Sequence, residues 1–162
     1  MEVVIAIMII TMGMVGVLSL VIQNVKAQYI NKNVLMATGL AQEGLELVRN
    51  IRDLNWLTIG NAWKDNIVGD GTYTIDYGGA INYRSLDSIK MAINSIDEAG
   101  ASLYVDSNGF YTHTVTATAT NFYRLITVID NGDYLDVKCA IRWKDGTQDH
   151  NYTAETYLYD WR

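Results

Sequence analysis

The sequence predicts an α+β protein in which one long N-terminal helix, apolar in its first half, packs by its second half on an antiparallel β-sheet head. Three observations predict this: an uncharged apolar run near the N-terminus, an amphipathic continuation without turn signals, and strand-like segments between glycine turns after Trp56. We therefore divide the chain into an apolar helix at residues 1–25, its amphipathic continuation at residues 26–55 and a globular head at residues 56–162.

The apolar run covers residues 3–22, reads VVIAIMIITMGMVGVLSLVI and contains no charged side chain. About 20 such residues are enough to cross the hydrocarbon core of a bilayer. A secretory signal would begin with basic residues and end at a small-residue cleavage site, whereas here Glu2 precedes the run and no such site follows it. The run is therefore predicted to be a retained single-pass anchor. A carboxylate at the edge of an apolar segment is costly, so Glu2 is a candidate functional residue.

The helix is predicted to continue past Ile22, because no proline or turn cluster follows. Apolar residues recur there at helical spacing: Val25, Tyr29, Met36, Leu40, Leu47, Ile51 and Leu54. Glu46 and Arg49 form a favourable i, i+3 pair on another face. A single helix would be roughly 78 Å long at ~1.5 Å per residue. Its first half needs apolar partners on every side, and its second half needs one partner surface.

In the head, turn signals occur at five dipeptides: Asp70-Gly71, Gly78-Gly79, Asn108-Gly109, Asn131-Gly132 and Asp145-Gly146. Residues 103–105 and 110–113 are predicted to form a short hairpin, and residues 121–129, 134–143 and 151–159 an antiparallel meander. One face of the middle strand is predicted to cover the helix: Leu135, Val137, Cys139, Ile141 and Trp143. Residues 86–96 are predicted to be helical from the spacing of their apolar side chains.

Composition excludes several function classes. Twelve basic and 18 acidic residues give a net charge of -6, which argues against a nucleic-acid partner. A single cysteine, Cys139, allows neither an intramolecular disulfide nor a Cys-rich zinc site. His113 and His150 lie far apart in the sequence, so we predict no catalytic, metal or cofactor site and no enzyme activity. The segments 106–109 and 129–133 match turns better than calcium loops.

Two features suggest modification. Threonines at period two would place their hydroxyls on one side of an extended segment, as a solvated strand edge or as a glycosylated stripe: Thr112, Thr114, Thr116, Thr118 and Thr120. Asn151 opens a formal N-glycosylation sequon, a three-residue pattern that is common by chance.

Several segments together resemble the type IV pilin family, pseudopilins included. MEVVIAIMIITMGMVG is similar to the family's segment around a glutamate, with Glu2 in that place. AQEGLELVRNIRDLNW at residues 41–56 resembles the second half of the pilin helix in a subgroup related to V-type minor pilins. FYRLITVIDNGDYLDVKCAIRW and TYLYDWR resemble that subgroup's terminal strands.

The resemblance implies the type IV pilin fold and a structural subunit that polymerises through its apolar helix into an extracellular filament for adhesion, motility or DNA uptake. The implied partners are identical subunits, a prepilin peptidase and the inner-membrane assembly machinery, and the helix would anchor the subunit in the membrane before assembly. The family glutamate lies four residues after the processed N-terminus, so we expect three mature residues and a leader ahead of Met1. Without the family's usual proline, Gly13 and Gly16 are the assembly positions where the helix would melt. The usual C-terminal disulfide is impossible with Cys139 alone.

Two alternatives stay open. Within the family, the chain would be a minor pilin or a secretion-system pseudopilin. From another class, it would be a monomeric membrane-anchored binding domain, whose head needs a concave ligand site.

Overall fold

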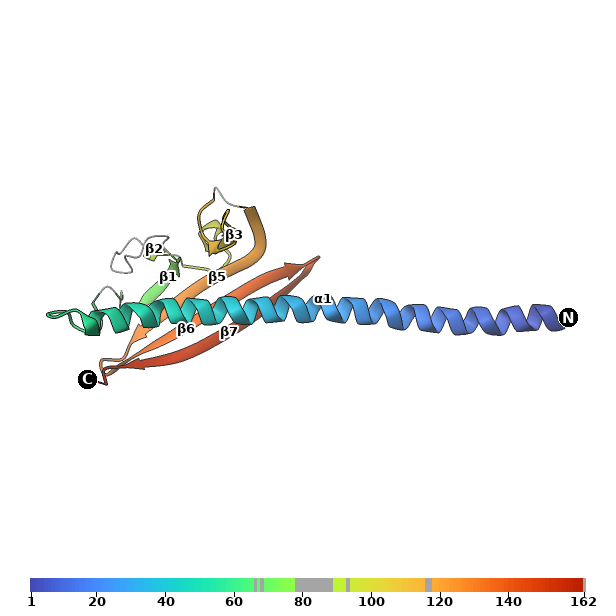
Figure 1. Ribbon diagram of the computed structural model, residues 1–162, viewed down its shortest axis with the longest axis horizontal. Helices are drawn as coiled ribbons and strands as arrows, with labels where there is room; N and C mark the ends of the chain where they lie inside the picture. Colours follow the sequence, from blue (N-terminus) through green and yellow to red (C-terminus); the bar gives the residue numbers. More distant parts are fainter. Residues whose placement is uncertain (66, 68, 78–88, 93, 116–117, 162) are drawn as a thin grey trace. The chain divides into compact units, whose positions relative to one another are not determined.

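The computed structural model describes residues 1–65, 67, 69–77, 89–92, 94–115 and 118–161. These residues form two compact units, Met1–Met36 and Ala37–Arg162. A helix, α1 (Glu2–Leu57), supplies all of the regular structure of the first unit and the opening residues of the second (Figure 1). The long helix predicted from the apolar run and its amphipathic continuation is thereby confirmed.

The second unit contains a sheet whose described strands are all antiparallel. They are β1 (Gly71–Ile75), β2 (Ile89–Ala92), β3 (Ser102–Val105), β4 (Tyr111–Thr112), β5 (Thr118–Asp130), β6 (Tyr134–Asp145) and β7 (Gln148–Tyr159), with a 3-10 turn, η2 (Ala99–Ala101), before β3. β5 is central: β6 pairs along one edge, and β1 and β3 share the other. β2 extends the sheet from β1, β4 from β3 and β7 from β6. The predicted hairpin and meander are therefore present (Figure 1).

Alternation along β6 decides which face of the sheet is buried. Its apolar residues are between 0% and 3% exposed: Leu135, Val137, Cys139, Ile141 and Trp143. The residues between them from Tyr134 to Arg142 are partly exposed. Alternate side chains of a strand point to opposite faces, so a slip of one residue would expose the whole apolar set. The predicted register is confirmed.

The second half of α1 packs on this face. Its buried apolar residues and one buried glycine follow helical spacing: Ala37, Leu40, Ala41, Gly44, Leu45, Leu47, Val48 and Ile51. Gly44 lies against Cys139 of β6 and Ile126 of β5. Val48 and Ile51 line a small apolar cavity of ≈ 20 Å³ together with side chains of β1 and β5. Packing of the helix on the sheet is thus direct, through small and branched apolar side chains.

One secondary-structure prediction is wrong. Within the segment 86–96, the part from Ile89 to Ala92 is strand β2 instead of helix, and residues 86–88 and 93 lie outside the described residues. Ala92 pairs with Tyr73 and Met91 with Thr74, so the backbone of β2 completes the edge of β1. The apolar spacing that predicted a helix is also compatible with a short strand, and pairing with β1 decided between them.

Candidate functional site

The first unit presents an apolar surface on every side of α1. Its large apolar residues at positions 3–22 are between 50% and 71% exposed. Thr11 Oγ1 donates to the Met8 carbonyl at 2.9 Å and Gln23 Nε2 to Ser19 Oγ at 3.4 Å, so these hydroxyls bond within the helix. Among the described residues, α1 is the helix with the length and composition of a membrane anchor or signal. Within this unit, the segment has no apolar partner of its own.

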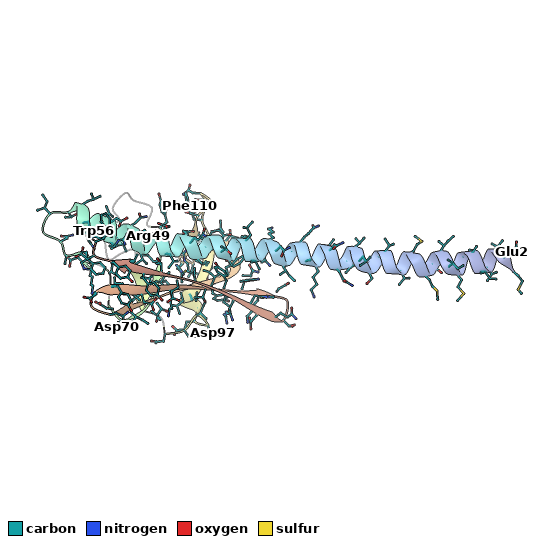
Figure 2. The ribbon with its side chains drawn as sticks, turned by 90° about the horizontal axis from the view of Figure 1, so that it is seen from below. Glu2, Arg49, Trp56, Asp70, Asp97 and Phe110 are labelled. Atoms are coloured by element: carbon teal, nitrogen blue, oxygen red, sulfur yellow. The ribbon has the colours of Figure 1, made fainter. Side chains whose placement is uncertain are left out.

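The predicted assembly residues lie on this surface. Glu2 stands in the first turn of α1, where a carboxylate is favourable beside the positive end of the helix dipole (Figure 2). Gly13 and Gly16 lie within regular helix, and a Cβ added at either would meet no atom within 4 Å. The helix surface is therefore shallow at these two glycines, and no contact within the chain requires a glycine at either position. Gly13 lines an open apolar groove with Ile10, Met14 and Val17.

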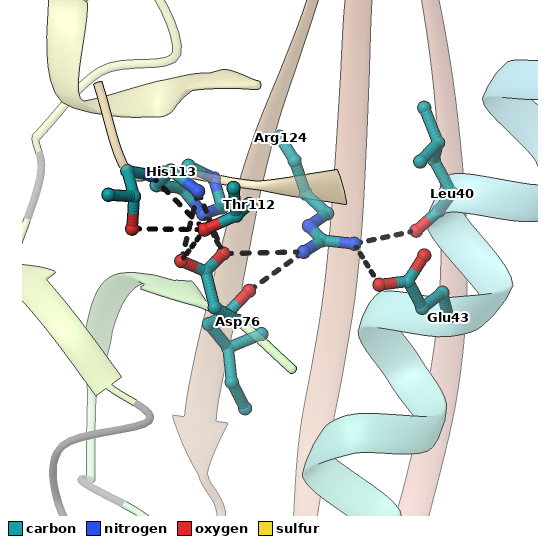
Figure 3. A network of polar contacts seen from close by, with 8 residues as sticks. Leu40, Glu43, Asp76, Thr112, His113 and Arg124 are labelled. Carbon is teal, nitrogen blue, oxygen red and sulfur yellow. Dashed lines mark hydrogen bonds and ion pairs between the residues drawn. The ribbon is translucent and has the colours of Figure 1, made fainter. Parts of the chain in front are cut away.

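A second candidate is a buried polar network in the other unit. Four elements contribute: Glu43 from α1, Asp76 just after β1, His113 just after β4, and Arg124 from β5 (Figure 3). The Arg124 side chain is 0% exposed, and those of His113 and Asp76 are 3% and 2% exposed. Charged groups this deep are costly unless they are paired and hydrogen-bonded.

Asp76 is the acceptor at the centre of the network. Its carboxylate accepts from Thr112 Oγ1 at 3.0 Å, from the His113 backbone N–H at 2.9 Å, and from His113 Nδ1. Burial opposes ionisation of Asp76, but the hydrogen bonds and charge of His113 and the Thr112 hydroxyl outweigh it. They hold the pKa of Asp76 well below its usual value. Asp76 therefore ties the end of β1 to the β4 segment as an ionised group.

Arg124 ties the sheet to the helix. Its Nη2 donates to the Ile75 carbonyl at 2.8 Å and its Nη1 to the Leu40 carbonyl at 3.5 Å. Nη1 also lies 3.2 Å from Glu43 Oε1, and Nη2 lies 3.8 Å from Asp76 Oδ1. The guanidinium thus bridges a carboxylate on α1 and one after β1 (Figure 3). Breaking such a pair is costly, because it leaves an uncompensated buried charge.

The chemistry open to this network is structural. The Asp76–His113 pair has the form of a base and its orienting carboxylate, but both side chains are almost completely enclosed, and the neighbouring Thr112 hydroxyl donates to Asp76. In the described parts of the chain, no three His, Cys, Asp or Glu side chains are grouped as a metal site would require. The network therefore acts as an electrostatic link between helix and sheet.

The predicted modification sites are dispersed. Thr112 closes β4, Thr118 and Thr120 lie in β5, and Thr116 is outside the described residues. The Thr112 hydroxyl donates to Asp76, and Thr120 Oγ1 donates to the Leu103 carbonyl at 2.7 Å. Thr114 is exposed just beyond β4. The described threonines therefore do not share one strand, because the chain leaves β4 before it enters β5.

Asn151 is exposed on β7, opposite Arg142 of β6. Its side chain lies on the outer face of the sheet, away from the face that packs on α1. Cys139 is buried in β6, and burial raises the pKa of its thiol to about 12. It is a small core residue, as predicted.

Sequence reasoning missed the polar network, although one signal for it exists. Arg124 shares the parity of Phe122, Ile126 and Val128 in an apolar strand, which places a cation on the buried face. A buried cation requires an anion nearby. Nothing local identifies that anion, because Glu43 and Asp76 come from distant segments.

No known protein family, curated protein or solved structure matched the chain when it was compared with them.

Proposed function

We propose that the chain is a type IV pilin-like structural subunit, which polymerises through its N-terminal helix into an extracellular filament. The observation that carries the proposal is the apolar surface of α1 at residues 3–22, exposed on every side and headed by Glu2. Such a surface is stable in lipid before assembly and in a bundle of identical helices after it. The helix-on-sheet arrangement of the second unit and the sequence resemblance support the same function.

The proposal gives Glu2 a specific role. A carboxylate inside an apolar bundle needs a cation, and the processed amino terminus of a neighbouring subunit would supply one. The pair would set the depth at which each new helix enters the bundle. Before assembly, the helix would hold the subunit in the inner membrane, where a prepilin peptidase and the assembly machinery act on it.

Negative-stain microscopy of material sheared from producing cells, without detergent, tests the proposal. We expect thin filaments that contain this chain, and mass spectrometry of their subunit to give the processed N-terminus. Glu2→Ala should insert in the membrane but not assemble, since loss of a buried pair costs ~3 to 5 kcal/mol. Glu46→Ala, on the same helix but outside the apolar run, is the matched control and should assemble.

Other outcomes separate the alternatives. Dispersed, vesicle-bound particles in place of filaments would support a monomeric anchored domain and overturn the filament proposal. Short or scarce assemblies found only together with another, more abundant subunit would indicate a minor pilin or pseudopilin. Normal filament yield from Glu2→Ala would remove the glutamate from the assembly mechanism.

A further inference from the structure

An open hollow lies at the end of α1 within the second unit. Its volume is ≈ 460 Å³, and its lining includes Trp56, Thr58, Asn61, Trp63 and Asp160. Small-molecule sites usually have volumes of about 300 to 1,000 Å³. The lining combines two indole rings with an amide, a hydroxyl and a carboxylate. This polar and aromatic lining distinguishes the hollow from a packing defect in the core and from a purely apolar groove.

The loop that forms one wall of the hollow is held by hydrogen bonds. Asn55, itself 3% exposed, donates from Nδ2 to the Trp63 carbonyl at 3.1 Å and to the Asp65 carbonyl. The Ala62 N–H donates to Asp65 Oδ2 at 2.8 Å. Gly60 has a φ of 93°, a conformation that lets the chain turn between the two tryptophans. A wall fixed in this way loses little entropy when a ligand binds.

Trp56 is held by three contacts, with Asp160, Arg52 and Trp161. Its Nε1 donates to Asp160 Oδ1 at 3.2 Å, the Arg52 guanidinium lies 4.4 Å from its ring centroid, and the Trp161 ring meets it edge-on at 4.4 Å. Trp161 is itself 69% exposed. The chain therefore keeps a large indole exposed beside the hollow and holds another rigidly within it, although exposed tryptophan surface is unfavourable in water.

The two cations beside the hollow, Arg52 and Lys64, are paired with carboxylates of the chain itself. Arg52 Nη2 lies 2.8 Å from Asp53 Oδ1, and Lys64 Nζ lies 2.5 Å from Asp130 Oδ1. The same two cations lie over the indoles, since Lys64 Nζ is 5.0 Å from the Trp63 ring centroid. Because these two cations already have carboxylates, they do not favour a phosphate-bearing ligand, and because each lies over an indole, the rings do not call for a further cation.

Asn61 supplies the polar recognition. Within the described part of the chain its side-chain amide has no hydrogen-bond partner, so the donor and the acceptor are both available at the hollow. An amide of this kind matches two adjacent hydroxyls, one accepting and one donating. A pyranose ring offers such hydroxyl pairs at its edge and C–H groups on its face, and the electron-rich face of an indole attracts those C–H groups.

We infer that this hollow binds a neutral saccharide, with Trp63 contacting the ring face and Asn61 and Asp160 binding its hydroxyls. The inference does not depend on the chain forming filaments. It applies equally to a filament subunit and to an anchored monomer.

Saturation-transfer NMR on the full chain tests this inference. The chain is kept in lauryldimethylamine oxide micelles, because maltoside and glucoside detergents carry sugar head groups that would compete. The probes are maltose, cellobiose, lactose and N,N′-diacetylchitobiose, each as the free disaccharide. We expect transfer from protein aromatic protons to the ring C–H protons of at least one of them, and affinity about tenfold or more weaker in Trp63→Ala and Asn61→Ala.

Phe110→Ala is the matched control, since Phe110 is 51% exposed and stacks on Tyr77 away from the lining of the hollow. It should bind as the wild type does. If Trp63→Ala alters the near-UV circular dichroism, the result from Asn61→Ala decides, because that amide makes no hydrogen bond to the described residues. Absence of transfer to all four disaccharides, or undiminished transfer in Asn61→Ala and Trp63→Ala, would overturn the inference and leave the filament proposal untouched.

Discussion

Gly44 of α1 faces Cys139 of β6 so closely that a Cβ atom added at position 44 would lie 2.7 Å from the Cys139 sulfur. The same atom would lie 2.9 Å from Ile126 Cδ1 and 3.4 Å from Arg124 Cδ. Helix and sheet therefore approach each other at a point where the helix has no side chain. This point lies beside Arg124, whose guanidinium links the sheet to Glu43 of the helix.

Substitution at this contact should be less favourable than substitution at an exposed glycine of the same helix. Gly44→Ala gains ~1 kcal/mol of helix propensity, but overpacking a close contact costs ~1 to 3 kcal/mol. Gly39→Ala, at an exposed position where a Cβ meets nothing within 4 Å, receives the same propensity gain without that cost. The difference between the two variants in free energy of unfolding, measured in urea, should therefore be ~1 to 3 kcal/mol, with Gly39→Ala the more stable. Equal stabilities would show that the helix does not approach the sheet at Gly44.

The ionised Asp76 carboxylate should make the free energy of unfolding decrease at acidic pH. Its pKa is lowered in the fold from the model-compound value of 3.8, so its contribution is fully present above that value and is lost as the pH falls below it toward the folded-state pKa. Asp76→Asn should lower stability at about pH 7 by ~3 to 5 kcal/mol, because Arg124 loses a buried partner. The variant should also lose less stability than the wild type between about pH 5 and about pH 3.

Urea unfolding of the full chain at several pH values measures both effects. Asp133→Asn is the control, because Asp133 is exposed in the turn between β5 and β6. Parallel pH profiles for the wild type and Asp76→Asn would contradict an ionised Asp76 at the centre of the network.

Cys139 should be unreactive in the folded protein. Burial raises the pKa of its thiol to about 12 and leaves it 0% exposed, so thiolate is scarce at neutral pH and reagents cannot reach it. Mass spectrometry after treatment with N-ethylmaleimide should find no adduct in the native chain and one adduct per chain in denaturant. Rapid labelling without denaturant would mean that the β6 face opens readily.

Filaments, if they form as proposed, should resist salt and reductant and dissolve in detergent. Burial of the apolar helices would supply most of the stability, at ~25 cal/mol per Å² removed from water. At ~1 M salt the Debye length is only ~3 Å, which weakens surface ion pairs but not this burial. Sedimentation of sheared filaments after each treatment measures the loss. Filaments that fall apart in salt or reductant yet survive detergent would instead be held by ion pairs or by intermolecular Cys139 bridges.

The elements with long, regular patterns were predictable from the sequence. Helix α1 is specified by an uncharged apolar run, then by apolar residues at helical spacing, with no proline in either part. The local sequence favours a helix along the whole segment, so no part of it conflicts with the fold. Strict alternation in β6 specifies both a strand and the face that it buries, since side chains alternate across a sheet. The glycines at positions 109, 132 and 146 mark turns, and all three adopt positive φ.

Only the tertiary structure decided the rest. β2 is a strand because its backbone pairs with the edge of β1. That edge is formed by residues 71–75, which are distant in sequence from residues 89–92, so the local pattern of β2 could not predict the pairing. Glu43, Asp76, His113 and Arg124 meet because α1, β1, β4 and β5 converge, so the partners of a buried charge depend on long-range contacts that no local pattern encodes. The close contact at Gly44 likewise depends on residues that are distant in sequence, Cys139 and Ile126. From the sequence alone, a glycine inside a helix is only a residue of low helix propensity. The position of the Cys139 sulfur shows that a side chain at position 44 would collide with β6.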